Sequence, residues 1–314
     1  RCPYCMPEKT YSQNYSFLKE HQWLTFDEIT RATQAFVDLG VRKIRLTGGE
    51  PLLRPDITEL VQKLRQITGI QDLALTTNGS LLAQHAHNLK TAGLNRLTIS
   101  LDSIDDQEFQ IMSGNKGKLK HVWEGIAAAE KAGFESLKFN VVSQKGINDK
   151  NIIELIERFR GTQHVVRFIE YMDVGTCNHW DQSAVITSKY IRDLISEKYS
   201  LEPLEANYFG EVASRYRYQD GKGEVGFISS ISQPFCQSCT RARLSADGKV
   251  YTCLFARKGH DIKPDLQSKD PSQLRDTLQK IWNKREDRYS ELRQEFINSS
   301  TNSSDKVEMF HIGG

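Results

Sequence analysis

The stretch VRKIRLTGGEP, residues 41–51, contains the pattern from which the predicted fold is built. In its first part, apolar residues alternate with Lys43 and Arg45 as in a β-strand, and TGGEP then forms a loop. Similar apolar stretches follow at residues 73–79, 97–103, 137–143 and 165–172. They recur at intervals of roughly 25 to 40 residues with helical patterns between them, as βα units require. The sequence therefore predicts parallel strands joined by right-handed helical crossovers.

The intervening helices carry start and stop signals. Thr25 and Glu28 form a capping box, and Gly40 ends a helix whose apolar residues recur at helical spacing. We expect further helices after Pro55 and over residues 122–132, 152–159, 189–198 and 272–296. After Gly175 the pattern changes, because EVASRYRY and EVGFISS, joined through QDGKG, predict a β-hairpin in a second, smaller module.

Polar residues gather where the predicted strands end, at residues 47–50, 76–78 and 100–103. An open doubly wound sheet and a barrel both place their chemistry at this carboxyl edge, so we expect the functional site there. No P-loop motif occurs in the chain. The two glycines of TGGEP expose backbone groups that could contact an amino or carboxylate group of a ligand, and a plain turn is the alternative.

Composition excludes several classes of protein. The net charge is only +2, since 40 acidic residues balance 42 Lys and Arg residues, so a nonspecific nucleic-acid binder is not expected. No apolar run approaches the roughly 18 residues that a membrane helix needs. We therefore expect a cytoplasmic protein with no membrane partner. Its length suits one large α/β domain, or one domain with an appendage.

Five of the six cysteines fall into two groups, which predict metal or cofactor ligands in a reducing compartment more than disulfides. The first group is Cys2 and Cys5, the second is Cys236, Cys239 and Cys253, and the remaining cysteine, Cys177, is interpreted as an idle thiol. Zinc, a redox dithiol and an iron–sulfur cluster all use the C-x-x-C spacing. A cubane cluster on three thiolates leaves one iron open to a small molecule, which explains a group of three.

Zinc is the main alternative for the second group. A structural zinc ion prefers four closed ligands, and His260 is the candidate for the fourth. Two groups that each offer three cysteines, if an upstream cysteine completes the first, favour clusters instead. The chain starts at Arg1, and we expect that cysteine four residues before Cys2.

Basic residues accompany the cysteines and the strands. Arg241 and Arg243 alternate in an extended segment, so both could face one anion; a solvated sheet edge is the alternative. Four more basic residues fall on or near predicted strands: Lys43, Arg45, Lys138 and Arg167. Charges on buried strands are costly unless they face a lumen or an anion, so the sequence indicates a polyphosphate ligand.

With these motifs together, the chain resembles radical S-adenosylmethionine (SAM) enzymes and, more narrowly, the GTP 3′,8-cyclase family of molybdenum cofactor biosynthesis. The resemblance rests on RCPYCMP, KIRLTGGEPLLR, LTTNGSLL, RLTISLDS, VVSQKGIND, RFIEYMDVG, CQSCTRARLSADGKVYTCLFA and the terminal GG, which span nearly the whole chain. It implies an incomplete (βα)6 barrel of the TIM type whose first strand lies upstream of Arg1. It also implies a division into a radical SAM barrel over residues 1–210 and an auxiliary 4Fe-4S module over residues 211–314.

The resemblance further implies two 4Fe-4S clusters and SAM as cofactors. Metal ligands would be Cys2, Cys5, Cys236, Cys239 and Cys253. The SAM site would include Tyr4, Thr47, Gly49, Asn78, Ser100 and Met172. GTP would be held by Lys43, Arg45, Thr76, Lys138, Arg167, Arg241 and Arg243. Catalytic roles would fall to Arg241, Arg243 and the tail residues Gly313 and Gly314, with a frayed tail as the alternative.

In the reaction that the resemblance implies, SAM cleavage gives a 5′-deoxyadenosyl radical. The radical removes the ribose 3′ hydrogen of GTP, and the resulting carbon radical attacks C8 of guanine. A flavodoxin- or ferredoxin-type electron donor and a downstream cyclic pyranopterin monophosphate synthase would be partners, and a homodimer is allowed. The alternatives are a radical SAM enzyme that modifies a peptide and, from another class, a zinc-stabilised nucleic-acid-binding protein.

Overall fold

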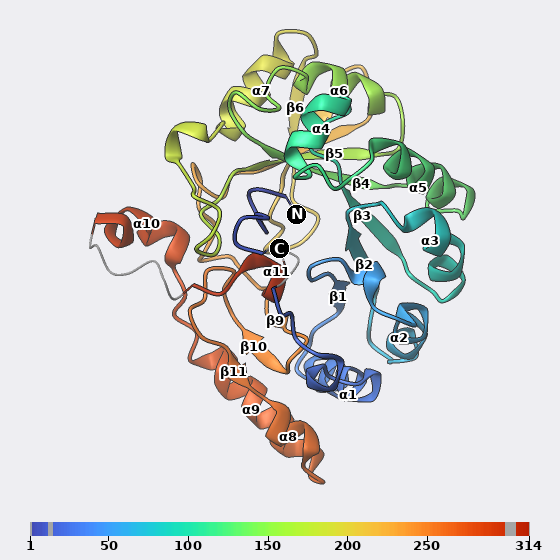
Figure 1. The fold of residues 1–314 in the computed structure, drawn as a ribbon, viewed down its shortest axis with the longest axis vertical. Coiled ribbons are helices and arrows are strands. Elements are labelled where there is room, and N and C mark those ends of the chain that lie inside the picture. Colours follow the sequence, from blue (N-terminus) through green and yellow to red (C-terminus); the bar gives the residue numbers. More distant parts are fainter. Residues whose placement is uncertain (1, 12–14, 299–305, 314) are drawn as a thin grey trace.

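A computed structural model describes residues 2–11, 15–298 and 306–313 of the chain. Its centre is an eight-stranded sheet in the order β1-β2-β3-β4-β5-β8-β7-β6. The strands are β1 (Lys43–Leu46), β2 (Asp72–Thr77), β3 (Arg96–Ser100), β4 (Lys138–Ser143), β5 (Val165–Glu170), β6 (Leu201–Leu204), β7 (Ser214–Tyr218) and β8 (Glu224–Ile228). Neighbours from β1 to β5, and β5 with β8, run parallel. The curved, mostly parallel sheet is an incomplete α/β barrel, as expected (Figure 1).

Helices cover the outer side of the barrel sheet (Figure 1). They are α1 (Phe26–Asp38), α2 (Ile57–Arg65), α3 (Leu82–Thr91), α4 (Asp106–Met112), α5 (Leu119–Lys131), α6 (Ile152–Phe159) and α7 (Ser188–Ser196). The capping box of α1 is confirmed: Thr25 Oγ1 accepts a hydrogen bond from the Glu28 amide at 3.2 Å, and the Glu28 carboxylate accepts one from the Thr25 amide at 2.7 Å. No described helix is long and apolar enough to cross a membrane.

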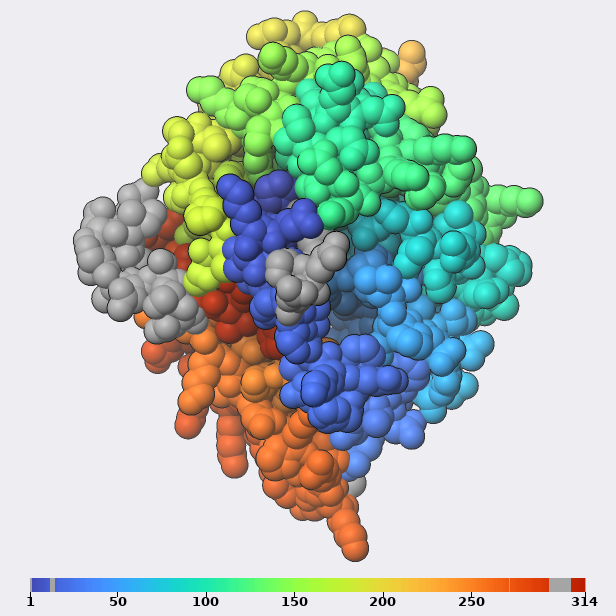
Figure 2. Space-filling model, viewed as in Figure 1, coloured from blue at the N-terminus to red at the C-terminus, as the bar shows by residue number. Residues whose placement is uncertain are grey.

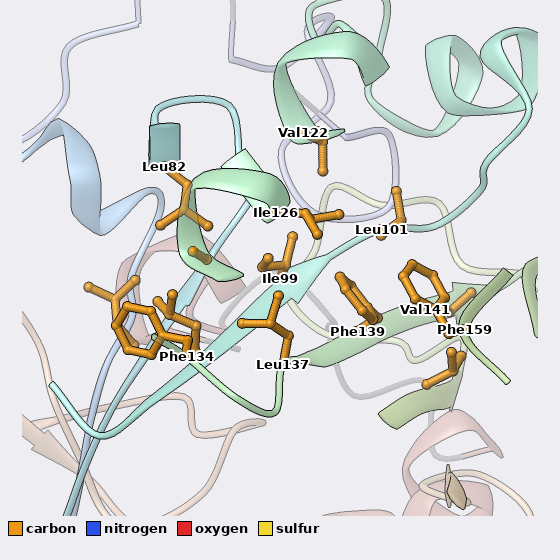
Figure 3. Close-up of a cluster of buried hydrophobic side chains, with 14 of the residues drawn as sticks. Leu82, Ile99, Leu101, Val122, Ile126, Phe134, Leu137, Phe139, Val141 and Phe159 are labelled. Atoms are coloured by element: carbon orange, nitrogen blue, oxygen red, sulfur yellow. The ribbon is translucent and has the colours of Figure 1, made fainter. Parts of the chain in front are cut away.

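The main core lies between the sheet and these helices. Figure 3 shows Val122 and Ile126 of α5 pointing toward the side chains of Ile99 and Leu101. Farther along the sheet, the rings of Phe139 and Phe159 stack with centroids 4.1 Å apart. Since burying one large apolar side chain contributes about 1.5–3 kcal/mol, this layer fixes the barrel wall. The opposite faces of the same strands are thereby left to line the lumen.

The predicted hairpin is confirmed as β7 and β8, but it does not belong to a separate module. β8 pairs in parallel with β5, with Arg167 opposite Gly226. The sheet therefore runs on beyond residue 210, where we expected the barrel to end. Local patterns could identify the hairpin, but only long-range hydrogen bonding shows which strand it joins.

The rest of the chain forms a small C-terminal part. It contains a three-stranded sheet, β9 (Arg243–Leu244), β10 (Lys249–Tyr251) and β11 (His260–Asp261), and the helices α8 (Lys263–Gln267), α9 (Pro271–Asn283), α10 (Tyr289–Asn298) and α11 (Met309–Ile312). A second core packs its apolar side chains against α1. Short 3-10 turns lie at Glu20–Gln22, Pro51–Leu53 and Gln182–Ala184.

The single helix predicted over residues 272–296 is wrong, because α9 ends at Asn283 and α10 begins at Tyr289. The turn between them carries Arg285, whose guanidinium donates a hydrogen bond to the Cys239 carbonyl. Residues 284–288 connect the two helices, and the contact with Cys239 is made from this connection. Helical periodicity alone gives no sign of it.

Candidate functional site

The barrel lumen is lined by a row of basic side chains from neighbouring strands. Arg45 donates from Nη1 to Thr76 Oγ1 at 2.8 Å and to Thr98 Oγ1 at 3.1 Å, while Arg167 Nη2 lies 3.4 Å from the same Thr98 oxygen. Lys138 stands opposite Thr98 in the register of β3 and β4. The row therefore runs from β1 across the sheet to β5. The predicted residues Lys43, Arg45, Lys138 and Arg167 belong to it, and the predicted Thr76 of β2 accepts a hydrogen bond from Arg45.

The basic side chains of this row outnumber the acidic groups that act on them, Asp72 and Glu211. Burial, and then the neighbouring Arg167, lower the pKa of Lys138 to about 8. Burial, followed by Arg45, lowers the pKa of Arg167 to about 10, and burial also lowers the pKa of Arg45 and Lys43. Arg45 remains accessible to water within the open lumen although protein surrounds most of it. Such a row suits a ligand that brings several negative charges.

A loop that the sequence did not single out covers one end of the row. The Lys43 ammonium lies 3.0 Å from the centre of the Tyr208 ring, a cation–π contact. Glu211, in the same loop, is an acidic group whose charge reaches Lys138 and Arg167. Sequence offered no signal for either residue, because the loop joins β6 to β7 and meets β1 only through the fold.

The second cysteine group surrounds one cavity of about 70 Å³. Cys236, Cys239 and Cys253 line it together with Arg241 and Arg243. Ala242, between the two arginines, is exposed, so the predicted alternation is confirmed and the alternative of a solvated edge is wrong for this pair. Met172, expected at the SAM site, lines the same cavity. The charge of Arg241 also acts on Arg45, so the cavity and the lumen row lie within electrostatic range of each other.

The thiols of this cavity differ in their environments. Burial alone would raise the pKa of Cys239, but the adjacent Arg241 guanidinium, which also donates a hydrogen bond, and Arg285 bring it below its usual value. Burial raises the pKa of Cys253 instead. Burial and the neighbouring Arg241 lower the pKa of Arg243 to about 10. The arginines thus supply the positive charge that thiolate ligands need.

The donor set fits a 4Fe-4S cluster better than a zinc ion. His260, the expected fourth zinc ligand, is exposed in β11 and does not line the cavity. Within the described ranges, no three Cys, His, Asp or Glu side chains converge closely enough to hold one metal ion. A cubane is larger than one ion and holds its thiolates further apart. Three cysteines around one cavity, without a fourth, match a cluster with one open iron.

The first cysteine group lies in a turn at the start of the chain. The Cys5 and Met6 amides donate to the Cys2 carbonyl at 3.0 and 2.8 Å. Burial, and then the neighbouring Cys2, raise the pKa of Cys5 to about 12, so its thiolate is favoured only when a metal binds it. Figure 2 shows the N-terminal segment, in dark blue, lying in the middle of the face where the barrel and the C-terminal part meet.

Tyr4 ties this turn to the barrel. Its hydroxyl donates to Asp102 Oδ2 at 2.7 Å, and Asp102 Oδ1 accepts from the Val142 amide at 2.8 Å. Burial raises the pKa of Asp102 to about 6. The carboxylate that follows β3 therefore fixes both the cysteine turn and the adjacent strand β4.

The loops at the carboxyl edge are fixed by a second acid. Glu50 of the TGGEP loop accepts hydrogen bonds from Thr77 Oγ1 and the Asn78 amide, both at 2.7 Å. Ser100 ends β3 at the same edge. Of the residues expected around SAM, Thr47, Gly49, Asn78 and Ser100 thus lie at the ends of strands, as the barrel requires, whereas Tyr4 lies in the N-terminal turn.

The C-terminal tail returns into this site. The Glu308 carboxylate accepts from the Thr176 amide at 2.9 Å and from its hydroxyl at 2.6 Å. Gly313 is buried, and its carbonyl accepts a hydrogen bond from Arg243 Nε at 3.2 Å. A Cβ on Gly313 would lie 2.4 Å from Thr47 Cγ2, so the tail passes close to the TGGEP loop. Gly314 lies outside the described residues.

Aromatic contacts hold the tail as well. The Phe310 ring meets the rings of Tyr11, Tyr15 and Phe17 edge-on, with the Tyr11 centroid 4.9 Å away. The Tyr11 hydroxyl also donates to Cys177 Sγ at 3.5 Å, so this cysteine sits beside the tail, and it does not line the cavity of the second cysteine group. The frayed-tail alternative is therefore wrong for residues 306–313.

Comparison with known proteins places these features in a family. Residues 1–159 match the profile of the radical SAM superfamily, and residues 164–291 match the profile described as Molybdenum Cofactor Synthesis C. A GTP 3′,8-cyclase of Xanthomonas axonopodis pv. citri (strain 306) is 52% identical over the whole chain and 92% of the relative. Another GTP 3′,8-cyclase, of Acidothermus cellulolyticus (strain ATCC 43068 / DSM 8971 / 11B), is 46% identical over the whole chain and 93% of the relative.

The fold agrees with solved structures of more distant proteins. The crystal structure of Streptococcus suis SuiB bound to precursor peptide SuiA matches with a TM-score of 0.62 at 14% identity, over 87% of this chain and 61% of that one. The curved sheet, the cysteine groups and the profile matches define a radical SAM enzyme. Within that superfamily, the chain belongs to the GTP 3′,8-cyclase family, whose cofactors are SAM and 4Fe-4S clusters.

Proposed function

We propose a division of labour by which this chain carries out the GTP 3′,8-cyclase reaction. The observation that carries it is the pair of basic sets, the lumen row and the arginines of the cysteine cavity, which lie within electrostatic range of each other through Arg45 and Arg241. The triphosphate of GTP would lie along the row. There the positive charges of Lys43, Lys138 and Arg167 outnumber the negative charges of Asp72 and Glu211. The guanine ring would lie toward Cys236, Cys239 and Cys253.

We assign SAM to the carboxyl edge near Cys2 and Cys5. When bound there, SAM supplies the 5′-deoxyadenosyl radical that takes the 3′ hydrogen of the ribose. Tyr4, through its bond to Asp102, and Glu50, through its bond to the Asn78 amide, fix the backbone groups around it. The other expected contacts are Thr47, Gly49, Ser100 and Met172.

The protein's own contribution is to position the nucleotide and to exclude water. Arg243 holds the Gly313 carbonyl, so the tail closes the site between the TGGEP loop and the cysteine cavity. A segment without side chains can pass within contact distance of a bound nucleotide. With the ribose 3′ carbon held near C8 of guanine, ring closure competes with escape of the reactive intermediate.

Three further partners complete the proposal. SAM cleavage consumes one electron, so a flavodoxin- or ferredoxin-type donor must dock near the first cysteine group. The cyclised nucleotide would pass to a cyclic pyranopterin monophosphate synthase, and a homodimer is the assembly to test by light scattering.

We assign the enzyme to the cytoplasm because all six cysteines are unpaired, as a reducing compartment maintains them.

The decisive experiment uses the full-length holoenzyme, prepared without oxygen, with SAM, dithionite and either GTP or ATP. We expect 5′-deoxyadenosine together with conversion of GTP into an isomer of equal mass, and no conversion of ATP. Cleavage of SAM with GTP unchanged would overturn the substrate assignment and direct attention to peptides. Mass spectrometry distinguishes these results.

A further inference from the structure

The turn between α9 and α10 reaches back into the cavity of the second cysteine group. Arg285 and Asp287 of this turn line the cavity beside Cys236, Cys239 and Cys253, although they lie more than thirty residues further along the chain. The Arg285 guanidinium donates through Nη1 to the Cys239 carbonyl. This contact joins α9 and α10 to the loop that carries two of the three thiols.

Arg285 is held in place from several sides. Its Nε lies 3.4 Å from Asp287 Oδ2, and its guanidinium carbon lies 5.0 Å from the centre of the Trp282 ring. The Arg285 side chain is only 13% exposed, so its three contacts with protein replace most of its water. A guanidinium fixed in this way is a rigid positive charge beside Cys239.

The two facing atoms of the ion pair between Arg285 and Asp287 are buried but lack a hydrogen bond. Arg285 Nε and Asp287 Oδ2 face each other at 3.4 Å, and neither atom makes a hydrogen bond in the described part of the chain. A buried ion pair that lacks hydrogen bonds regains little of the free energy that its desolvation costs. Fold stability alone does not require a charged pair here, since apolar side chains of similar size would avoid that cost.

The charged side chains around the cavity are mostly positive. Arg241, Arg243 and Arg285 contribute three positive charges, while Asp287 adds a negative charge next to the thiol ligands. A positive charge near an iron–sulfur cluster stabilises its reduced form and raises its reduction potential, and a negative charge does the opposite. Arg285 and Asp287 are therefore placed to act on the cluster in opposite directions.

We propose that Arg285 and Asp287 are positioning residues of the second cluster. Arg285 fixes the Cys239 loop, and the two side chains together set the charge beside the cluster and hence its reduction potential. This inference rests on the proposed function, because that function assigns a cluster to Cys236, Cys239 and Cys253.

The test measures the second cluster by itself. In full-length protein carrying Cys2→Ala and Cys5→Ala, only the second cluster is retained, and its potential is followed by electron paramagnetic resonance in an anaerobic dithionite titration. We expect Arg285→Gln to lower the potential and Asp287→Asn to raise it. Arg285→Lys keeps the charge, so its potential should stay near that of the parent. Arg275→Gln is the matched control, because Arg275 lies on α9 with its side chain 51% exposed.

The outcomes distinguish the assignment of a cluster to the second cysteine group from the role of Arg285 and Asp287 beside it. A parent that binds no iron at the second group would overturn the assigned cluster, and with it the proposed function. A parent with an intact cluster whose potential is the same in Arg285→Gln and Asp287→Asn, or shifts in the same direction in both, would overturn only the inference. If Arg285→Gln loses its iron, Asp287→Asn decides the sign, and a potential that is unchanged or lowered in Asp287→Asn would overturn the inference.

Discussion

Arg243 donates a hydrogen bond from Nε to the backbone carbonyl of Gly313 at 3.2 Å, across seventy positions of sequence. One residue thus belongs both to the cavity of the second cysteine group and to the contact that holds the C-terminal tail. The tail also passes beside Thr47, which follows β1. Closure of the site therefore depends on three segments together: the C-terminal tail, the segment of Arg243 and the loop that follows β1.

Gly313→Ala is expected to reduce GTP conversion by about tenfold or more, which corresponds to about 1.4 kcal/mol or more. Gly313 has a φ of 75°, and a Cβ there would lie 2.4 Å from Thr47 Cγ2. Both the strained backbone and the collision would move the tail. Gly221→Ala is the matched control, because Gly221 has a φ of 76° with open space around it. Equal conversion by the two variants would contradict the role of the tail.

Binding of GTP should weaken as pH rises through about 8. The pKa of Lys138 is lowered to about 8 by burial and by Arg167, so its charge is present below that pH and lost above it. The phosphates of GTP are ionised throughout this range. The change should be on the order of tenfold between pH 7 and 9, the size of one charge-assisted contact. Equilibrium dialysis measures it.

Lys138→Met supplies the comparison for this pH dependence. It should bind GTP weakly at every pH, with a flatter profile. Lys120→Met, at a side chain of α5 that is 83% exposed, should behave like the parent. A steep profile retained in Lys138→Met would assign the titration to another group.

Tyr4→Phe should loosen the turn that carries Cys2 and Cys5. The lost hydrogen bond to Asp102 is worth roughly 1.5–3 kcal/mol, because its acceptor is charged. Hydrogen exchange of residues 2–6 should speed up, and the first cluster should lose iron faster to a chelator. Tyr190→Phe is the control, since Tyr190 is 59% exposed. Unchanged exchange would show that the Tyr4 hydroxyl does not hold the turn.

Asp173→Asn should lower the free energy of unfolding by roughly 3–5 kcal/mol, because it breaks a buried ion cluster. Asp173 Oδ1 accepts from Arg293 Nε at 2.9 Å, and Oδ2 lies 3.1 Å from Lys306 Nζ. Thermal and denaturant unfolding measure the loss. Asp276→Asn, at a side chain that is 53% exposed, should change stability by less than about 0.5 kcal/mol.

The same carboxylate predicts the pH dependence of stability. Burial alone would raise the pKa of Asp173, but Arg293, Tyr289 and Lys306 bring it below its usual value of 3.8. Its contribution is therefore complete above about pH 4 and is lost as pH falls through the lowered pKa. Asp173→Asn should remove that part of the acid sensitivity, and an unaltered acid profile would contradict this account.

The sequence by itself determined the local features. The strands from β1 to β5 and the capped helix α1 follow from apolar periodicity and short-range hydrogen bonds, which depend on residues close together in the chain. The alternation of Arg241 and Arg243 correctly predicted that both face one space. The grouping of the cysteines, together with the family motifs, was enough to predict the class of cofactor.

Tertiary structure alone decided which distant segments share the site. No local pattern indicates that β8 pairs with β5, that Tyr208 covers Lys43, or that the turn at Arg285 interrupts a charged helix to meet Cys239. In these contacts the edge of β5, the charge of Lys43 and the backbone carbonyl of Cys239 each gain a partner. Periodicity reveals which face of an element is buried, whereas the identity of the partner depends on the packing of the whole chain.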